Sequence, residues 1–173
     1  MVEFILFDLK IHKEEYRQLN VELIEWIADQ LKKNYQIDSV SIVGQTIPEY
    51  VDNHLEDLVD LKPPDGIIYL LLVDGNVEGM GAIRKLNDQT GEIKRMYIRP
   101  VRRGRGYGRQ MLNKLLDAGK EFGCSSFLLE TGKFMNVAQH IYKSAGFVER
   151  EEYPESETLT ILRQYQLFME KKE

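Results

Sequence analysis

Apolar and polar positions along the chain follow two different periods, and each period predicts one kind of element. Apolar residues recur at helical spacing in four segments, which predicts amphipathic helices over residues 13–34, 48–59, 108–122 and 136–145. Shorter runs are almost continuously apolar or alternate with polar residues, which predicts strands over residues 2–9, 67–73, 77–86, 92–99, 127–130 and 165–169, with another opening at Phe147. The predicted order is β-α-α-β-β-β-α-β-α-β-β, an α/β (α+β) chain with a mixed sheet and helices on its faces.

Turn-forming residues separate these segments. Pro63-Pro64-Asp65-Gly66 ends the second helix, and Asp74-Gly75 predicts a tight hairpin between two strands. Pro100 lacks a backbone N–H and should stop the strand before it. No internal repeat, low-complexity segment or linker interrupts the 173 residues, so we expect a single domain over residues 1–173.

The most informative stretch follows Pro100. Glycines stand at the alternate positions 104, 106 and 108, with arginines around them, between a predicted strand and a predicted helix. Missing β-carbons let the backbone approach an anion, and the first turn of a helix adds unpaired N–H groups and a positive dipole end. Seven of the 23 Lys and Arg residues lie between Lys94 and Arg109, although the whole chain has a net charge of −5. This concentration indicates one anionic ligand that is held locally.

The spacing of the glycines excludes two common phosphate-binding motifs. A Walker A loop needs Gly-Lys followed by Ser or Thr, which is absent. Both registers of a G-x-G-x-x-G fingerprint fail, because Arg109 and Met111 stand where the last glycine belongs. The pattern R-x-x-G-x-G fits at Arg103, Gly106 and Gly108. At this point the chain resembles the acetyl-CoA pyrophosphate loop of the GNAT superfamily of N-acetyltransferases.

A second segment strengthens the resemblance. Asn136, Ala138, Tyr142 and the pair Gly146-Phe147 resemble a helical segment of the same superfamily, and they follow the loop in the right order. The order of the predicted elements is also the one that the superfamily shares. The resemblance therefore covers nearly the whole chain and implies a GNAT fold, with a mixed, mostly antiparallel central sheet and helices on both faces.

The resemblance further implies acetyl-CoA as the cosubstrate. Backbone N–H groups of the loop would hold its pyrophosphate, at Arg103, Gly104, Arg105, Gly106, Tyr107 and Gly108. The backbone of Tyr97 and Ile98 would pair with the pantetheine arm like an added strand, and an N–H on that strand would face the thioester oxygen. Asn136 resembles a position that binds the cofactor arm. It could instead cap its helix, because asparagine is a preferred N-cap residue, or do both.

Two residues are implied in the reaction itself. Tyr142 resembles a tyrosine that protonates the departing thiolate, and a phenol with a pKa of about 10 is protonated at neutral pH; the alternative is core packing. Glu92 resembles the glutamate that serves as the base in some members. A carboxylate with a pKa of about 4.3 is a poor base unless burial raises that pKa or water relays the proton. A solvated strand-edge role for Glu92 therefore stays open, and Glu130 is the reserve candidate.

The implied function is an acetyl-CoA-dependent N-acetyltransferase, an acyltransferase that moves the acetyl group to a primary amine of a small molecule by direct attack in a ternary complex. Acetylation of a protein N-terminus or lysine remains an alternative, as does a non-catalytic acyl-CoA sensor. In the family the acceptor site uses the early helices and the late hairpin, here residues 14–60 and 153–158. Acidic residues there suit a cationic amine, although a charge run is also typical of a solvated face. They are Asp52, Glu56, Asp57, Asp60, Glu155 and Glu157.

Composition narrows the setting further. No apolar run approaches the roughly 20 residues of a membrane helix, and the amino-terminal stretch lacks the basic region of a signal peptide. The single cysteine, Cys124, excludes an intrachain disulfide and fits a small buried residue in a reducing compartment, so we expect a cytoplasmic protein.

His54 and His140 have no partner at metal-ligand spacing, so we expect no metal. The arginine–glycine tract is too short for RNA binding in an acidic chain, so we expect neither a nucleic acid nor a membrane partner. A homodimer stays open.

Overall fold

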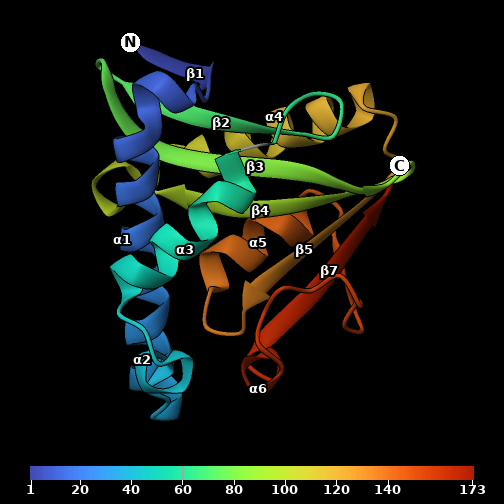
Figure 1. Cartoon of the computed structure of the whole chain (residues 1–173). Helices are drawn as coiled ribbons and strands as arrows, with labels where there is room; N and C mark the ends of the chain where they lie inside the picture. The colour runs from blue at the N-terminus through green and yellow to red at the C-terminus, as the bar shows by residue number, and fades with distance from the viewer. Residues whose placement is uncertain (60) are drawn as a thin grey trace.

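The chain forms a seven-stranded sheet with helices on both faces (Figure 1). The computed structural model describes residues 1–59 and 61–173, and the side chains of all of these except residues 56–59. The strands are β1 (Val2–Leu6), β2 (Gly66–Val73), β3 (Asn76–Asn87), β4 (Thr90–Ile98), β5 (Ser126–Gly132), β6 (Val148–Arg150) and β7 (Gln166–Lys172). The helices are α1 (Leu9–Tyr35), α2 (Ser39–Val43), α3 (Ile47–Val59), the 3-10 turn η1 (Pro100–Arg102), α4 (Tyr107–Glu121), α5 (Asn136–Ser144) and α6 (Thr160–Arg163).

The sheet has the order β1-β2-β3-β4-β5-β7-β6. Among the described strand pairs, β4 with β5 is parallel and the others are antiparallel. This arrangement confirms the predicted mixed, mostly antiparallel sheet. No helix in the described part of the chain is both long enough and apolar enough to cross a membrane.

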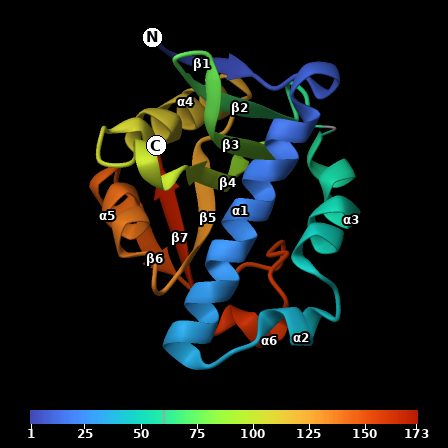
Figure 2. The same ribbon diagram turned by 90° about the vertical axis from the view of Figure 1, so that its left-hand side faces the viewer.

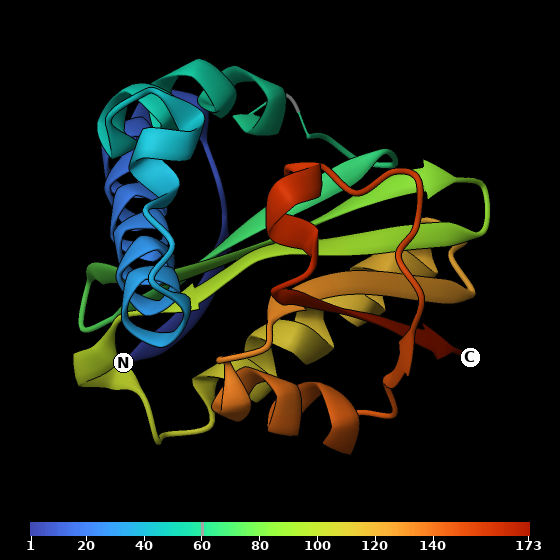
Figure 3. The ribbon, with the colours of Figure 1, turned by 90° about the horizontal axis from the view of Figure 1, so that it is seen from below.

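The helices cover the two faces of the sheet separately. Helices α1 and α3 lie on one face and α4 and α5 on the other, as the view from below shows (Figure 3). Each face has its own core, because neighbouring residues of a strand point in opposite directions. In β2, Leu70 packs with the α1 side and Leu71 with the α4 side, and both are fully buried. The continuous apolar run of this strand therefore buries both of its faces, as predicted.

Helix α4 lies very close to the sheet because glycines stand at the contact. A β-carbon on Gly119 would lie 2.6 Å from Cδ1 of Ile83, and one on Gly81 would lie 2.8 Å from Cγ of Met111. No side chain larger than hydrogen fits at either place without a shift. This close packing fixes the position of α4 and, with it, the glycine-rich loop at its amino-terminal end.

Strands β4 and β5 pair at one end only and then separate. Their pairing runs from Thr90 with Ser126 to Ile93 with Leu129, after which the two strands diverge (Figure 1). A β-bulge lies just beyond the last pair. Met80 pairs with Tyr97 and Ala82 with Lys94, so that two residues of β4 stand opposite Gly81 alone. A bulge bends its strand, and here the bend coincides with the opening of the sheet.

Several predicted boundaries were wrong. Helix α1 begins at Leu9 rather than at residue 13, because the Asp8 side chain accepts a hydrogen bond from the Lys10 N–H at 2.8 Å and caps the helix. The first strand accordingly stops at Leu6. The last strand continues to Lys172, three residues beyond its apolar run, because it pairs with β5 along its whole length. Helices α2 and α6 were not predicted, since four or five residues are too few to show a period.

Candidate active site

A cavity of about 740 Å³ lies where β4 and β5 diverge. Helix α1 crosses in front of the sheet there (Figure 2), and residues of α1, α2 and α6 line the cavity. The apolar walls come mainly from these helices, with Leu23, Ile24, Ile27, Leu31, Val40, Val43, Ile47, Leu159 and Leu162. Most of the polar lining comes from the strands, α5 and the segment after β6, with Arg84, Glu92, Lys94, Arg95, Glu130, Thr131, Tyr142 and Glu157, and the early helical region adds Ser39, Gln45, Tyr50 and His54.

Tyr142 lies on α5 beside the point of divergence. Its side chain is 7% exposed and lines the cavity, and its ring meets Phe147 edge-on at 6.0 Å. The only acceptor near its hydroxyl in the described part of the chain is Sδ of Met96, at 4.0 Å, which is a weak partner. Burial raises the pKa of Tyr142 to about 12. The phenol therefore keeps its proton at neutral pH and has no strong acceptor for it.

Glu92 is not a solvated strand-edge residue, which was one of its two predicted roles. It is 2% exposed and lines the same cavity as Tyr142. Its Oε2 accepts from Nε of Arg84 at 2.6 Å, and its Oε1 accepts from the hydroxyl of Tyr153 at 2.8 Å. Burial, and then the neighbouring carboxylates, raise the pKa of Tyr153, so this phenol remains a donor. These two donors satisfy both oxygens of a carboxylate that would be costly to bury without partners.

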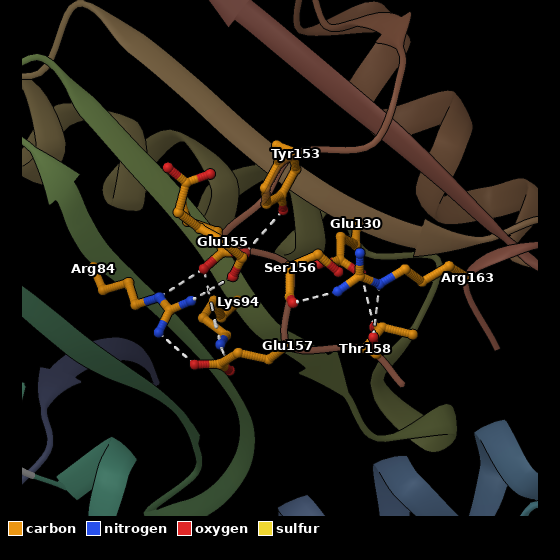
Figure 4. A network of polar contacts seen from close by, with 10 residues as sticks. Arg84, Lys94, Glu130, Tyr153, Glu155, Ser156, Glu157, Thr158 and Arg163 are labelled. Atoms are coloured by element: carbon orange, nitrogen blue, oxygen red, sulfur yellow. Dashed lines mark hydrogen bonds and ion pairs between the residues drawn. The ribbon is translucent and has the colours of Figure 1, made fainter. Parts of the chain in front are cut away.

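Glu130, the reserve base, lies across the cavity on β5. Its Oε2 accepts from Oγ1 of Thr158 at 2.7 Å, and the side chain is half-buried (Figure 4). The other carboxylate oxygen receives no hydrogen bond from the described residues. The structure thus brings both predicted carboxylates and the predicted acid to one cavity.

The glycine-rich loop leaves a run of backbone donors without partners. Gly104 and Gly106 adopt positive φ angles of +76° and +79°, and Gly106 is the N-cap of α4. From Gly104 to Arg109, no described residue accepts a hydrogen bond from the backbone N–H groups. The N–H of Arg103 donates to Pro100 O at 3.2 Å, so the unpaired run begins one residue later than expected. Successive N–H groups around left-handed glycines form a concave site for an anion.

Salt bridges hold the segment that leads into this loop. Arg99 donates to Glu22 on α1 at 2.9 Å, and Arg102 donates to Glu78 on β3 at 2.9 Å. The charge of each arginine is thus largely neutralised by a half-buried or buried glutamate. These two side chains position η1, and they are not free to bind a ligand.

The Arg103 side chain also has a structural role. Its guanidinium lies 5.7 Å from the ring centre of Trp26 and 5.6 Å from that of Tyr97, and its Nε donates to Ile98 O at 2.8 Å. The chain has one tryptophan, so Trp26 reports directly on this loop. Arg105 in the same loop is exposed, and no described residue pairs with it.

The remaining predicted cofactor residues lie along the same path. Tyr97 and Ile98 belong to the part of β4 whose edge toward β5 is unpaired, since the β4–β5 pairing ends at Ile93. Asn136 is exposed and is the first residue of α5. The N-cap is Met135, and no side chain caps this helix, so the capping role proposed for Asn136 was wrong.

The three acidic acceptor residues that the structure describes, Asp52, Glu155 and Glu157, do not form the open acidic surface that the sequence suggested. Asp52 pairs with Arg17 at 2.8 Å and does not line the cavity. Glu157 does line it, but it pairs with both Arg84 and Lys94, and Glu155 accepts from Arg84 only through its backbone oxygen. The other three predicted carboxylates, Glu56, Asp57 and Asp60, lie outside the described side chains. Within the described residues, no group of three or more His, Cys, Asp or Glu side chains is arranged to hold a metal ion.

Arg84 and Tyr153 are the site residues that the sequence did not reveal. Each donates a hydrogen bond to Glu92. Arg84 lies eight residues before Glu92 in the sequence, and Tyr153 lies 61 residues after it. Arg84 lies in an ordinary strand pattern, and Tyr153 lies in a segment that looked only turn-like. No local signal distinguishes either of them.

The chain is similar to known acetyltransferases. The sequence model of the Acetyltransferase (GNAT) family matches residues 20–147. A protein of Azospirillum brasilense described as an IAA acetyltransferase is 37% identical over 99 residues, which is 57% of this chain and 65% of that relative, less than two thirds of its length. A GNAT-family acetyltransferase from Staphylococcus aureus has a TM-score of 0.71 at 19% identity, with 99% of each chain covered. An N-acetyltransferase from Thermoplasma acidophilum in complex with coenzyme A has a TM-score of 0.71 at 16% identity, covering 100% of this chain and 99% of that one. These two structural likenesses show the fold.

Removing Arg84 alone should destabilise the protein more than removing Arg84 together with the charge of Glu92. In Arg84→Met the Glu92 carboxylate stays buried with Tyr153 as its only hydrogen-bond donor and Lys94 Nζ 3.8 Å away. We expect the free energy of unfolding to fall by about 2 kcal/mol, measured by urea denaturation. The double variant Arg84→Met/Glu92→Gln no longer carries the buried carboxylate and should recover part of this loss. A double variant less stable than Arg84→Met would contradict the role of Arg84 as the partner of a buried anion.

Proposed function

Because the chain belongs to the Acetyltransferase (GNAT) family, we propose that it transfers an acetyl group from acetyl-CoA to a primary amine. The observation that supports this most is the placement of Tyr142, Glu92 and Glu130 around one cavity, where β4 and β5 part. The same strand β4 leads from that cavity to the glycine-rich loop. A binding site for an anionic cofactor and a site for proton transfer are therefore joined by one strand.

The residues of the chain fit acetyl-CoA. Unpaired N–H groups from Gly104 through Arg105, Gly106 and Tyr107 to Gly108 would hold the pyrophosphate, with the positive end of α4 behind them. The unpaired edge of β4 at Tyr97 and Ile98 would accept the pantetheine amides as an added strand. The exposed amide of Asn136 lies at the start of α5 and is proposed to contact the same arm.

Tyr142 is proposed as the general acid in a direct transfer within a ternary complex. As the new N–C bond forms and the C–S bond breaks, its phenol would give a proton to the departing sulfur. A pKa of about 12 means that nearly every molecule carries this proton at neutral pH. Its weak contact with Met96 leaves the O–H free to turn toward the cavity.

A base must take a proton from the substrate ammonium before attack. We propose Glu92, acting through a water molecule, since both of its oxygens already accept hydrogen bonds. Glu130 is the alternative, with one oxygen that no described residue contacts. The cavity is lined on several sides by side chains, which favours a small molecule over a protein as the acceptor.

Gly106→Val should abolish acetyl-CoA binding, because a side chain at this φ of +79° is strained and would project into the anion site. Binding is measured by calorimetry and by the emission of Trp26. Gly75→Val is the matched control, since Gly75 also has a positive φ, +82°, and open space around its β-carbon. The control should lose stability but retain affinity. Unchanged affinity in a folded Gly106→Val protein would remove the loop from the cofactor site.

Tyr142→Phe should lower kcat by about 10²–10⁴-fold, because only the proton donor is lost. The release of free CoA thiol with a panel of amines measures turnover. Affinity for acetyl-CoA should hardly change, and Tyr69→Phe, a tyrosine of β2 outside the cavity lining, is the matched control. Since the pKa of Tyr142 is about 12, the parent enzyme should show no loss of activity from this group below about pH 10. A protein that binds acetyl-CoA but releases no thiol with any amine is a sensor, not an enzyme.

Glu92→Gln and Glu130→Gln compare the two candidate bases. The variant that lacks the base should lose most turnover at low pH, where little of the amine is neutral. Raising the pH toward the pKa of the amine should restore much of the rate, because a neutral amine needs no base. A deficit that is constant across pH would indicate positioning of the substrate. If Glu130→Gln alone shows the pH-dependent loss, Glu130 is the base.

A further inference from the structure

Five of the seven basic residues between Lys94 and Arg109 fall into two groups in the structure. Arg99, Arg102 and Arg103 hold the glycine-rich loop in place through glutamates and aromatic rings. Lys94 and Arg95 instead line the cavity proposed for the acceptor. The loop and its cofactor therefore do not account for these two cations.

The β-bulge allows the neighbouring side chains of Lys94 and Arg95 to line the same cavity. In a regular strand, two neighbouring side chains point to opposite faces. In β4, Ile93 and Met96 pack with the α4 side, and the extra residue of the bulge lies between Lys94 and Met96. That residue is Arg95, whose φ of +54° is rare for a side chain of this size. A backbone held in a sparsely populated region often marks a functional position.

A carboxylate of the protein itself already lies beside one of the two cations, Lys94. Glu157, on the segment between β6 and α6, pairs with Lys94 and with Arg84 (Figure 4). Burial alone would raise the pKa of Glu157, but the two cations outweigh it and hold that pKa below its usual range. The Glu157 side chain is 55% exposed, whereas that of Lys94 is 11% exposed. The cation is thus fixed in the cavity wall, and the anion comes from a loop that reaches it from outside.

Arg95 has no such partner in the part of the chain that the structure describes. It forms no ion pair or hydrogen bond with the described residues, although it is half-buried. On α1, the buried phenol of Tyr16 lies within reach of the Arg95 charge: burial raises the pKa of Tyr16, and Arg95 lowers it. A guanidinium binds a carboxylate through two parallel hydrogen bonds, so Arg95 next to Lys94 suits one more carboxylate.

We infer that the acceptor carries a carboxylate close to its amine, as an α-amino acid does, and that Arg95 and Lys94 bind this carboxylate. This rests on the proposed acetyl transfer. Arg95 is two residues from Tyr97 in the same strand, where the cofactor arm is expected to pass. The amine and the carboxylate must therefore be near each other. The apolar walls from α1, α2 and α6 suit an uncharged side chain, such as that of leucine or phenylalanine.

Turnover with acid and amide pairs tests the inference. For leucine and for phenylalanine, the kcat/KM of the acid is divided by the kcat/KM of its carboxamide. This acid-to-amide ratio should be at least about tenfold higher in the parent protein than in Arg95→Met. Comparing the ratios cancels the different intrinsic reactivities of the amines. Arg95→Lys should restore part of the preference. Arg17→Met, which removes an arginine paired with Asp52 outside the cavity, should leave the ratio unchanged. A preference for amides or simple amines that Arg95→Met does not alter would overturn the inference.

Direct binding separates this inference from the proposed function. N-acetylleucine and N-acetylleucinamide are titrated by calorimetry into the protein with CoA present. The acid should bind at least about tenfold more tightly, and Arg95→Met should abolish the difference. If this holds while no amine is acetylated, the carboxylate site stands and the proposed enzymatic activity fails. If amines are acetylated but acid and amide bind equally, the activity stands and the carboxylate site is wrong.

Discussion

The separation of β4 from β5 is the constraint on which the rest of the structure depends. Backbone groups in a sheet normally satisfy one another, and an unpaired edge inside a protein needs another partner. Here the pairing stops after Ile93 and Leu129, although both strands continue. Beyond this point the two strands no longer pair with each other, and the space between them widens into the cavity. The bulge at Arg95 bends β4 at this point, so one irregularity of the backbone accompanies both the open edge and the cavity.

Buried charges connect the sheet to the segment that closes the cavity. Glu92 would be costly to bury alone, and Arg84 and Tyr153 make it tolerable by donating a hydrogen bond each. Arg84 extends the network to Glu157, and Thr158 bonds to Glu130 on β5. The polypeptide between β6 and α6 is thereby attached to β3, β4 and β5. The shape of the cavity consequently depends on the same side chains that supply its charge, which links the lining of the cavity to the stability of the protein.

In the glycine-rich loop, the backbone and the arginine side chains have different roles. Its backbone N–H groups from Gly104 to Arg109 have no hydrogen-bond partner among the described residues, while its flanking arginines contact Glu22, Glu78 and Trp26. Charged side chains would bind phosphate too, but they are flexible and costly to order. Backbone donors at fixed φ angles, on a helix pressed against the sheet at Gly81 and Gly119, are ordered in advance.

The sequence by itself determined the main elements, the family and the position of the glycine-rich loop, because these depend on short-range patterns. Apolar periodicity located the main helices and strands, and the spacing of Arg103, Gly106 and Gly108 identified the loop, since a helix start and its glycines are neighbours in the chain. Only the tertiary structure decided which charges meet. It paired Glu92 with Tyr153 across 61 residues, used Arg99 and Arg102 for structure, and directed Lys94 and Arg95 into the cavity. A charge in a sequence has a sign but no partner. The partner is set by strand register, by a bulge and by the path of a distant loop, and no local pattern encodes these.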